Sequence, residues 1–366
     1  MQKEISLSEL ISGSALPVTR LGRGYSFAHH GEILQGVFEE TGGSLRRGLI
    51  TLVSNMFESE AIFYPDSSNV VRIEPQWKGK ARWAAELTLG LIGGPCKGGR
   101  LVMSSNIPPS WGFGSSTCDV TAATKAVADA FNVTLPCKVV AGLVVKAEIA
   151  SDPIMFDDRA VLFGQRDGVI LEDFSGTLPP LEVVGFNTDP EGVETLAFPP
   201  ARYTWWEVEA FRPLLGLVRQ AVFTQDAKMV GRAATASAQI NQRHLPKPQF
   251  DKCLKLAERV EALGVQVAHS GTLVGLLFDP DDPALNERVR EAQTLLGELR
   301  GGPIWHFRSA SEYLSIPSAE MIDKHAYHIS PVRQDADCGF ELAIDETQRR
   351  ICTEQISSDA LALKVG

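Results

Sequence analysis

The sequence predicts an α+β protein built as two lobes. Its 366 residues exceed one average domain, and 44% hydrophobic with 22% charged residues is typical of a globular chain with a substantial core. Strand and helix patterns are mixed up to about residue 178, and helix patterns with a few strands follow. This order of elements favours α+β lobes.

In the first part, short apolar runs predict strands, and apolar residues at helical spacing predict helices. The predicted strands cover 49–53, 61–64, 70–73 and 99–103, and the predicted helices cover 80–92, 116–131 and 138–150. Apolar runs over 161–187 predict further strands and turns, and 176–180 reads as the junction between the lobes.

In the second part, helical spacing dominates. The predicted helices cover 205–223, 226–241, 249–262 and 284–299, and the predicted strands cover 265–269, 273–278 and 304–307. The tail after residue 315 has no firm period. We therefore expect an N-terminal arm over 1–20, lobes over 21–178 and 179–315, and an extension over 316–366.

Charge and cysteine usage narrow the class of protein. The net charge of −10 argues against nonspecific binding to nucleic acid or to anionic membranes. We find no signal peptide and no run of about 18 apolar residues that would cross a membrane. The six cysteines lie far apart without a Cys-x-x-Cys pair, which favours reduced thiols in a cytoplasmic protein over zinc or disulfides. Cys118 is expected to be a buried structural thiol.

The most informative segment is Ile-Pro-Pro-Ser-Trp-Gly-Phe-Gly-Ser-Ser-Thr-Cys-Asp at 107–119, between a predicted strand and a predicted helix. Gly112 and Gly114 permit a sharp turn and close approach of a ligand. The amides and the dipole of the helix start favour an anion, and Ser115 and Ser116 offer hydroxyls to phosphate or metal. An ordinary capped helix start is the alternative. The segment lacks the Lys of a Walker A loop and the third Gly of the dinucleotide fingerprint.

An earlier segment, Ala-His-His-Gly-Glu-Ile-Leu-Gln-Gly at 28–36, offers an acid and an amide between two glycines. Glu32 and Gln35 suit a polar substrate with an ammonium or hydroxyl group. Metal binding by His29 and His30 is not expected, because no other ligand lies at suitable spacing on a recognisable element. A solvated turn is the alternative.

A third segment, Gly-Val-Gln-Val-Ala-His-Ser-Gly-Thr at 264–272, is a strand that ends in a small, hydroxyl-rich turn. Read alone, it is a hairpin turn with Gly271 at positive φ.

The candidate acids lie at 147–158. Glu148 and Asp152 share a helix face if the helix continues that far, and Pro153 is expected to stop it at Asp152. Alternatively, Glu148 is a surface residue and Asp152 a turn former, and Asp157 and Asp158 compete for either role. Two further pairs are expected to be structural: the tryptophans at 205–206 as core or interface residues, and the arginines at 46–47 as solvated loop cations.

The Pro-x-x-x-Gly-Phe-Gly-Ser-Ser pattern resembles the central motif of the GHMP small-molecule kinases. The Gly-Glu-x-x-Gln-Gly, Ala-His-Ser-Gly-Thr and Ser-Asp-x-x-Met-Phe patterns are similar to those of the L-threonine kinase branch, with Pro153 in place of a Gly. The spacing of Glu148 and Asp152 resembles the Glu-x-x-x-Asp of homoserine kinases, whose Glu contributes to a magnesium site. The resemblance spans roughly residues 25 to 310.

The resemblance implies an N-lobe like ribosomal S5 domain 2, a ferredoxin-like C-lobe and an ATP-dependent kinase. ATP, with Mg²⁺ as the second cofactor, would phosphorylate a small hydroxyl acceptor, most simply L-threonine or a related hydroxy amino acid. The implied nucleotide-binding residues are Pro108, Trp111, Gly112, Phe113, Gly114, Ser115, Ser116, Thr117, Ser270 and Gly271. The implied magnesium ligands are Ser116 and Glu148, which count as catalytic together with the base Asp152. The implied substrate-binding residues are His30, Glu32, Gln35, Asp152, His269 and Thr272.

Other acceptors stay open, including homoserine, pantoate and a specialised metabolite. A non-catalytic nucleotide or metabolite sensor of the same fold is the alternative from another class. The quaternary state is expected to be a monomer or homodimer.

Overall fold

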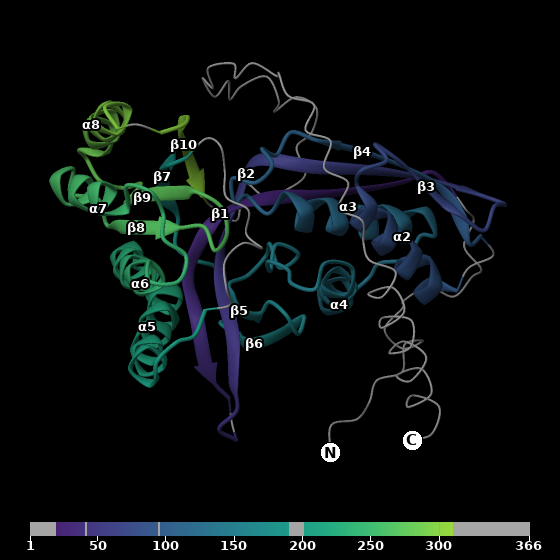
Figure 1. The fold of residues 1–366 in the computed structure, drawn as a ribbon, viewed down its shortest axis with the longest axis horizontal. Coiled ribbons are helices and arrows are strands. Elements are labelled where there is room, and N and C mark those ends of the chain that lie inside the picture. Colours follow the sequence, from purple (N-terminus) through teal and green to yellow (C-terminus); the bar gives the residue numbers. More distant parts are fainter. Residues whose placement is uncertain (1–19, 41, 94–95, 190–200, 300, 310–366) are drawn as a thin grey trace. The chain divides into compact units, whose positions relative to one another are not determined.

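A computed structural model describes residues 20–40, 42–93, 96–189, 201–299 and 301–309 (Figure 1). The chain separates into a compact unit over Met1–Ser330 and a second unit over Pro331–Gly366, and every described residue lies in the first. The predicted tail lies outside the described residues, as does the predicted arm except for Arg20. The predicted lobe boundaries stay a prediction.

Strands and helices are mixed as the sequence predicts. The strands are β1 (Gly22–Glu39), β2 (Leu45–Asp66), β3 (Val71–Glu74), β4 (Gly98–Ser105), β5 (Val161–Gly164), β6 (Val169–Asp173), β7 (Leu181–Asn187), β8 (Gly264–Val267), β9 (Leu273–Phe278) and β10 (Ile304–Ser309). The helices are α2 (Gly79–Ile92), α3 (Ser115–Ala130), α4 (Cys137–Glu148), α5 (Trp205–Thr224), α6 (Ala227–Asn241), α7 (Phe250–Arg259) and α8 (Leu285–Gly297).

One sheet runs through the described residues in the order β10-β7-β9-β8-β1-β2-β4-β3, and β5 and β6 branch from β2. All pairings are antiparallel except β3 with β4. β1 is therefore the strand that joins the half of the sheet containing β2 to the half containing β8. Figure 1 shows α2 and α3 beside the first half and α5, α6 and α7 beside the second.

Two local expectations were wrong, and one alternative is excluded. The runs 49–53 and 61–64 belong to the single strand β2, because its side chains continue to face the core through the polar residues between them. Residues 31–36 are buried within β1 and are not a solvated turn. Helix α4 ends at Glu148, because Ile149 takes a left-handed φ of 75° and its N–H bonds Val145 O.

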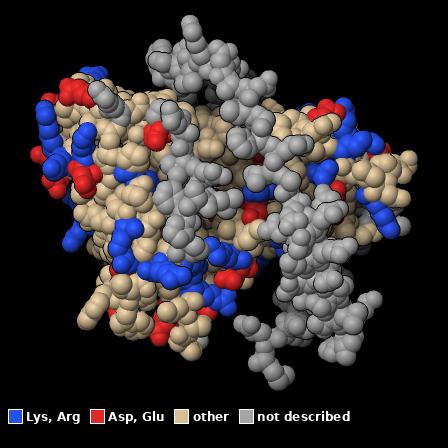
Figure 2. Space-filling model, in the orientation of Figure 1, with Lys and Arg blue, Asp and Glu red and all other residues tan. Residues whose placement is uncertain are grey.

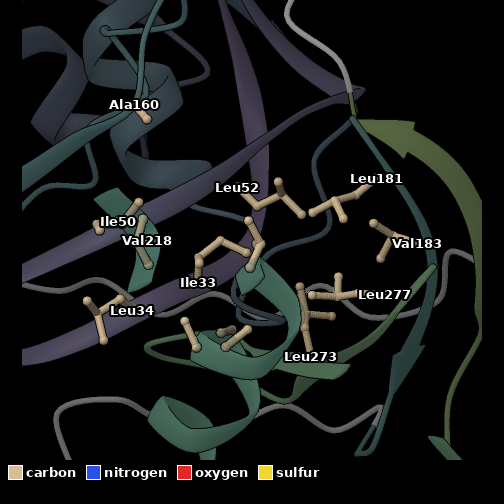
Figure 3. Packing of buried hydrophobic residues seen from close by; sticks show 14 of the residues in the cluster. Ile33, Leu34, Ile50, Leu52, Ala160, Leu181, Val183, Val218, Leu273 and Leu277 are labelled. Carbon is tan, nitrogen blue, oxygen red and sulfur yellow. The ribbon is translucent and has the colours of Figure 1, made fainter. Parts of the chain in front are cut away.

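The largest core cluster lies where β1 and β2 meet the second half of the sheet (Figure 3). Ile33 and Leu34 of β1 are fully buried against Val218 of α5 and against Leu273 and Leu277 of β9. Burying a side chain of this size contributes about 1.5–3 kcal/mol. The middle of β1 is therefore held firmly from both sides.

The surface carries charges of both signs. Figure 2 shows acidic and basic side chains next to one another on the face in view. Several form pairs, such as Arg219 with Glu172 at 2.6 Å and Arg288 with Asp282 at 2.9 Å. Exposed pairs of this kind contribute only about 0–1 kcal/mol each. Among the described residues, no helix is long and apolar enough to cross a membrane.

Candidate active site

The loop between β4 and α3 ends in a helix start without a side-chain cap. Gly114 is the N-cap of α3, with φ 74°, and no side chain accepts a hydrogen bond from the first turn. A Cβ at Gly114 would lie 2.5 Å from the His29 ring and 3.1 Å from Asp152 Oδ2, so only glycine fits there. Uncapped amides and the positive end of the dipole are the groups that bind phosphate at helix starts.

The same loop lies directly against the β8–β9 turn. Thr272 N–H donates to Trp111 O at 2.9 Å, and a Cβ at Gly112 would lie 2.2 Å from Ser270 O. The structure thus brings Gly112 and Ser270 together as the motifs suggest. The two backbones touch, however, so no ligand fits between Gly112 and Ser270, and the helix start stays the predicted position of an anion.

Glu148 lies beneath the first turn of α3. It accepts a hydrogen bond from Ser116 Oγ and another from Thr117 Oγ1, the latter at 2.8 Å. Its side chain is 3% exposed, and the nearest cation is Lys80, whose Nζ lies 4.0 Å away. Burial raises the pKa of Glu148 to about 7. This carboxyl is desolvated and incompletely neutralised, a state that a bound cation relieves.

Asp152 lies close by although it is not on α4. Thr117 Oγ1 is 2.8 Å from Glu148 Oε2 and 3.5 Å from Asp152 Oδ2, so α3 brings the two acids together. His29 Nδ1 accepts from Gly31 N–H at 3.1 Å, which leaves its Nε2–H to donate to Asp152 at 3.1 Å. Burial opposes ionisation of Asp152, but His29 outweighs it and lowers the pKa of Asp152. Asp152 is thus an ionised, half-buried carboxylate.

Irregular pairing of β1 brings side chains of this strand to Asp152. The register with β2 shifts three times between Phe27 and Leu34, and Gly31 has φ 72°. In a regular strand, residues three apart point to opposite faces. Here Glu32 Oε1 lies 3.8 Å from His29 Nδ1, so both side chains serve one site.

Glu32 is fully buried and incompletely bonded. Its Oε2 accepts from Thr51 Oγ1 at 2.6 Å, whereas its Oε1 has no hydrogen-bond partner among the described residues. Burial raises the pKa of Glu32 to about 8. An unpartnered buried oxygen costs free energy unless a ligand satisfies it.

Gln35, also on β1, lies at the same site. Its Oε1 accepts from Nδ1 of His269 at 2.6 Å, and Gln165 Nε2 lies 3.2 Å from the other nitrogen of that ring. Burial lowers the pKa of His269 to about 4, so the ring is neutral. Thr272 turns away, because its hydroxyl donates to Asn187 Oδ1 at 2.6 Å.

His30 points to the opposite face of β1. It is fully buried among Phe113, Trp305 and Phe307, at ring-centre distances of 5.0 to 5.8 Å. Trp111 stacks on Trp305 at 6.3 Å. The structure therefore does not bring His30 to Asp152, and it places Trp111 and Phe113 against the core under the loop. Pro108 lies half-buried where the loop leaves β4, and Ser115 is half-buried at the start of α3.

Two buried lysines contribute charges that the sequence analysis missed. Lys247, between α6 and α7, donates from Nζ to Gly271 O at 2.8 Å. Lys78 lies 2.6 Å from both carboxylate oxygens of Asp119, and Ser59 Oγ donates to Oδ1 of the same residue at 2.6 Å. The Pro-Lys-Pro context at 246–248 was the available signal for Lys247, since prolines fix a lysine on a rigid connection.

Two donor sets are candidates for a cation. His29, Glu32 and Asp152 each offer a ligand atom within 4.8 Å of the others. Both nitrogens of His29 are already hydrogen-bonded, so we assign no metal to this set. Ser116 and Glu148 instead offer only oxygens, the donors that Mg²⁺ prefers, beside a helix start that suits phosphate. Their residue types fit Mg²⁺.

The other acids and the arginines that the sequence analysis considered do not contact Asp152 in the described structure. Asp158 pairs with Arg159 at 2.6 Å, and neither Asp157 nor Asp158 contacts Asp152 in the described structure. Arg46 lies on β2 and binds Glu40 at 2.7 Å, and its neighbour Arg47 packs over the Tyr203 ring at 5.8 Å, so neither is a loop residue.

The cysteine and the two tryptophans that we expected to be structural differ in burial. Cys118 is fully buried, and burial raises the pKa of its thiol well above the ordinary value, which confirms the inert reading. Trp205 and Trp206 are 57% and 83% exposed and are not core residues.

The chain matches both domains of one enzyme family in sequence order. The family model for the GHMP kinases N-terminal domain matches residues 80–165, which contain α3, Glu148 and Asp152. The GHMP kinases C-terminal model matches residues 218–292, which contain Lys247 and the β8–β9 turn. The chain therefore carries matches to both GHMP kinase domains in the order that the sequence motifs indicate.

Two curated relatives are L-threonine kinases. An L-threonine kinase from Salmonella typhimurium is 29% identical over 213 residues, which are 57% of this chain and 66% of that protein. An L-threonine kinase from Citrobacter freundii is 31% identical over 183 residues, 49% of this chain and 62% of that protein. The matches thus span slightly less than two thirds of these relatives.

Solved structures confirm the fold. A homoserine kinase from Cytophaga hutchinsonii aligns with a TM-score of 0.60 and 15% identity over 81% of this chain and 97% of that one. A mevalonate kinase from methicillin-resistant Staphylococcus aureus gives 0.53 and 15%, over 79% and 99%. The predicted α+β GHMP kinase fold is confirmed.

Proposed function

We propose that this protein is an ATP-dependent phosphotransferase that phosphorylates the hydroxyl of L-threonine or a related hydroxy amino acid. The observation that carries the proposal is the convergence at the uncapped start of α3. Two carboxyls, Glu148 and Asp152, meet there on Thr117. The L-threonine kinases that resemble the chain support the choice of acceptor.

Different residues of the chain act on ATP and on the acceptor. The amides of Ser115, Ser116 and Thr117 bind the outer phosphates of ATP at the start of α3. Glu148 and the Ser116 hydroxyl hold Mg²⁺, which when bound neutralises charge on the phosphates. Lys80, 4.0 Å from Glu148, adds a positive charge at the edge of this site.

Asp152 accepts the proton of the acceptor hydroxyl. Its carboxylate is ionised and is oriented by His29, so it is ready to act as a base. The hydroxyl oxygen forms the new P–O bond as the bond between the γ-phosphorus and the bridging oxygen breaks, giving ADP, the phosphate ester and a proton. Alignment and charge stabilisation supply most of the catalysis.

The experiment is a measurement of ADP release by the full chain with ATP and Mg²⁺. Acceptors are L-threonine, L-serine, L-homoserine and matching hydroxy acids, and ³¹P NMR identifies the product. We expect turnover with a hydroxy amino acid to exceed the background without acceptor. Background rates with every acceptor would overturn the proposal.

Variants at neighbouring acids assign the base. Asp152→Asn should lower kcat by about 10²–10⁴-fold. The matched control is Asp158→Asn, which changes an exposed acid paired with Arg159 and should keep kcat within about twofold. A loss below tenfold in Asp152→Asn would leave that residue a positioning role.

A further inference from the structure

Lys247 is a buried cation whose single described partner is a carbonyl. It lies in the connection between α6 and α7, is 7% exposed and donates to Gly271 O at 2.8 Å. An ammonium carries three donors, and no carboxylate lies within 4.0 Å of this one in the described structure. Burial lowers the pKa of Lys247 to about 7. Burying such a lysine makes the free energy of folding less favourable unless a ligand brings an anion to it.

Its position faces the proposed acceptor site. Gly271 belongs to the turn that contacts Trp111, and His269, two residues earlier in this turn, is bonded to Gln35 of β1. Glu32 of β1 pairs with Val267 of β8, which directly precedes the turn that Lys247 contacts, so Glu32, His269 and Lys247 lie around the same turn.

Glu32 and Lys247 are an acid and a base that do not bond to each other. Each has bonding capacity to spare: the carboxyl has a buried oxygen without a partner, and the ammonium has two donors beyond Gly271 O. A gap of more than 4.0 Å separates them in the described structure. A molecule carrying an ammonium and a carboxylate side by side would satisfy both ends at once.

We propose that Lys247 binds the α-carboxylate of the acceptor while Glu32 binds its α-ammonium. Lys247 and Glu32 thus form a site for a zwitterion, whose hydroxyl is directed to Asp152. This inference rests on the proposed function and defines its substrate class as α-amino acids rather than amino alcohols or hydroxy acids.

The test compares two acceptors that differ only in the carboxylate. L-threonine and the matching enantiomer of 1-amino-2-propanol present the same hydroxyl and ammonium. In Lys247→Met, KM for L-threonine should rise about 10²-fold, because a buried charge-assisted contact is lost. Its kcat, and its KM for the amino alcohol and for ATP, should stay within about threefold. Lys247→Arg should recover part of the loss in KM, and the exposed Lys228→Met should match the unchanged protein.

Two results would overturn the inference. An equal loss with both acceptors, or a rise in KM for ATP, would assign Lys247 to the β8–β9 turn or to phosphate. Calorimetric binding of L-threonine needs no turnover and so separates the two proposals. Binding that Lys247→Met weakens would keep the site even if no acceptor were phosphorylated. Absence of binding to the unchanged protein would remove the site. Circular dichroism confirms that each variant folds.

Discussion

Two buried groups of charges lie in this molecule, and they differ in how completely they are bonded. Lys78 and Asp119 form a closed group, because one ammonium contacts both carboxylate oxygens at 2.6 Å and Ser59 adds a further bond. Glu32 and Lys247 form an open group, with a bare oxygen on one and a single carbonyl partner on the other. Burial is the same in both, so burial alone does not mark a functional residue.

The difference separates charges that stabilise the fold from charges that await a ligand. The closed group fastens α3 to the residue that precedes α2 and pairs its ammonium with a carboxylate of the protein itself. The open group, and Glu148 with it, leaves desolvated carboxyls that a ligand can satisfy. Removing a member of the first should cost stability, and removing a member of the second should cost activity.

The largest effect should follow loss of Glu148. Glu148→Gln should lower kcat by about 10³-fold, equal to about 4 kcal/mol, because the amide no longer offers a charged ligand to Mg²⁺. Steady-state kinetics across Mg²⁺ concentrations measures this. The exposed Glu258→Gln is the matched control. If Glu148→Gln kept more than a third of the activity, Glu148 would not be a metal ligand.

Next in size is the closed group. Lys78→Met leaves Asp119 buried without its cation and should lower the free energy of unfolding by about 3 kcal/mol. Urea denaturation measures the change. The double variant Lys78→Met with Asp119→Leu should recover part of it, because no bare charge remains. A double variant less stable than the single one would show that this pair contributes through more than mutual neutralisation.

A smaller effect of opposite sign is expected at Glu32. Its pKa is about 8 when folded against 4.5 ordinarily, so the unfolded chain ionises first as pH rises above 4.5 and the fold loses stability up to pH 8. Glu32→Gln removes this penalty and should stabilise the fold by about 1–2 kcal/mol at pH 8. At pH 4.5 the gain should vanish. Thermal unfolding at both pH values checks this, and equal gains would contradict it.

The smallest effect concerns His29. Without the contact to His29, Asp152 should ionise at a higher pH, because burial raises its pKa and His29 is the main group that lowers it. In His29→Phe the acidic limb of the profile of kcat/KM against pH should move upward by about one unit, equal to about 1.4 kcal/mol. The half-buried His306→Asn, on β10, is the control. If the acidic limb did not move, His29 would not control the pKa of Asp152.

Local patterns in the sequence predicted most elements but not the contacts between them. The phosphate loop, α3 and the β8–β9 pair follow from glycines, helical spacing and apolar runs. The expected shared helix face for Glu148 and Asp152 was wrong, and the two acids meet only because α3 presents Thr117 to both. That contact depends on packing between distant segments, which no spacing within 147–158 encodes.

The lysines show the same limit. Lys247 and Glu32 are far apart in sequence, and nothing near either residue indicates the other. Only the antiparallel arrangement of β1, β8 and β9 brings the turn that holds Lys247 beside β1. The neighbouring prolines indicate a rigid connection but do not indicate a buried ammonium.

The irregular stretch of β1 determines which of its side chains face the candidate site. Three register shifts and the positive φ of Gly31 decide that His29 faces Asp152 while His30 enters the aromatic core. The two histidines are chemically identical, so the strand path alone gives them different duties. Removing Ala28 would shift both histidines by one position along the strand and so exchange the faces they occupy, without changing either side chain. Insertions and deletions here should therefore be as damaging as substitution of the base.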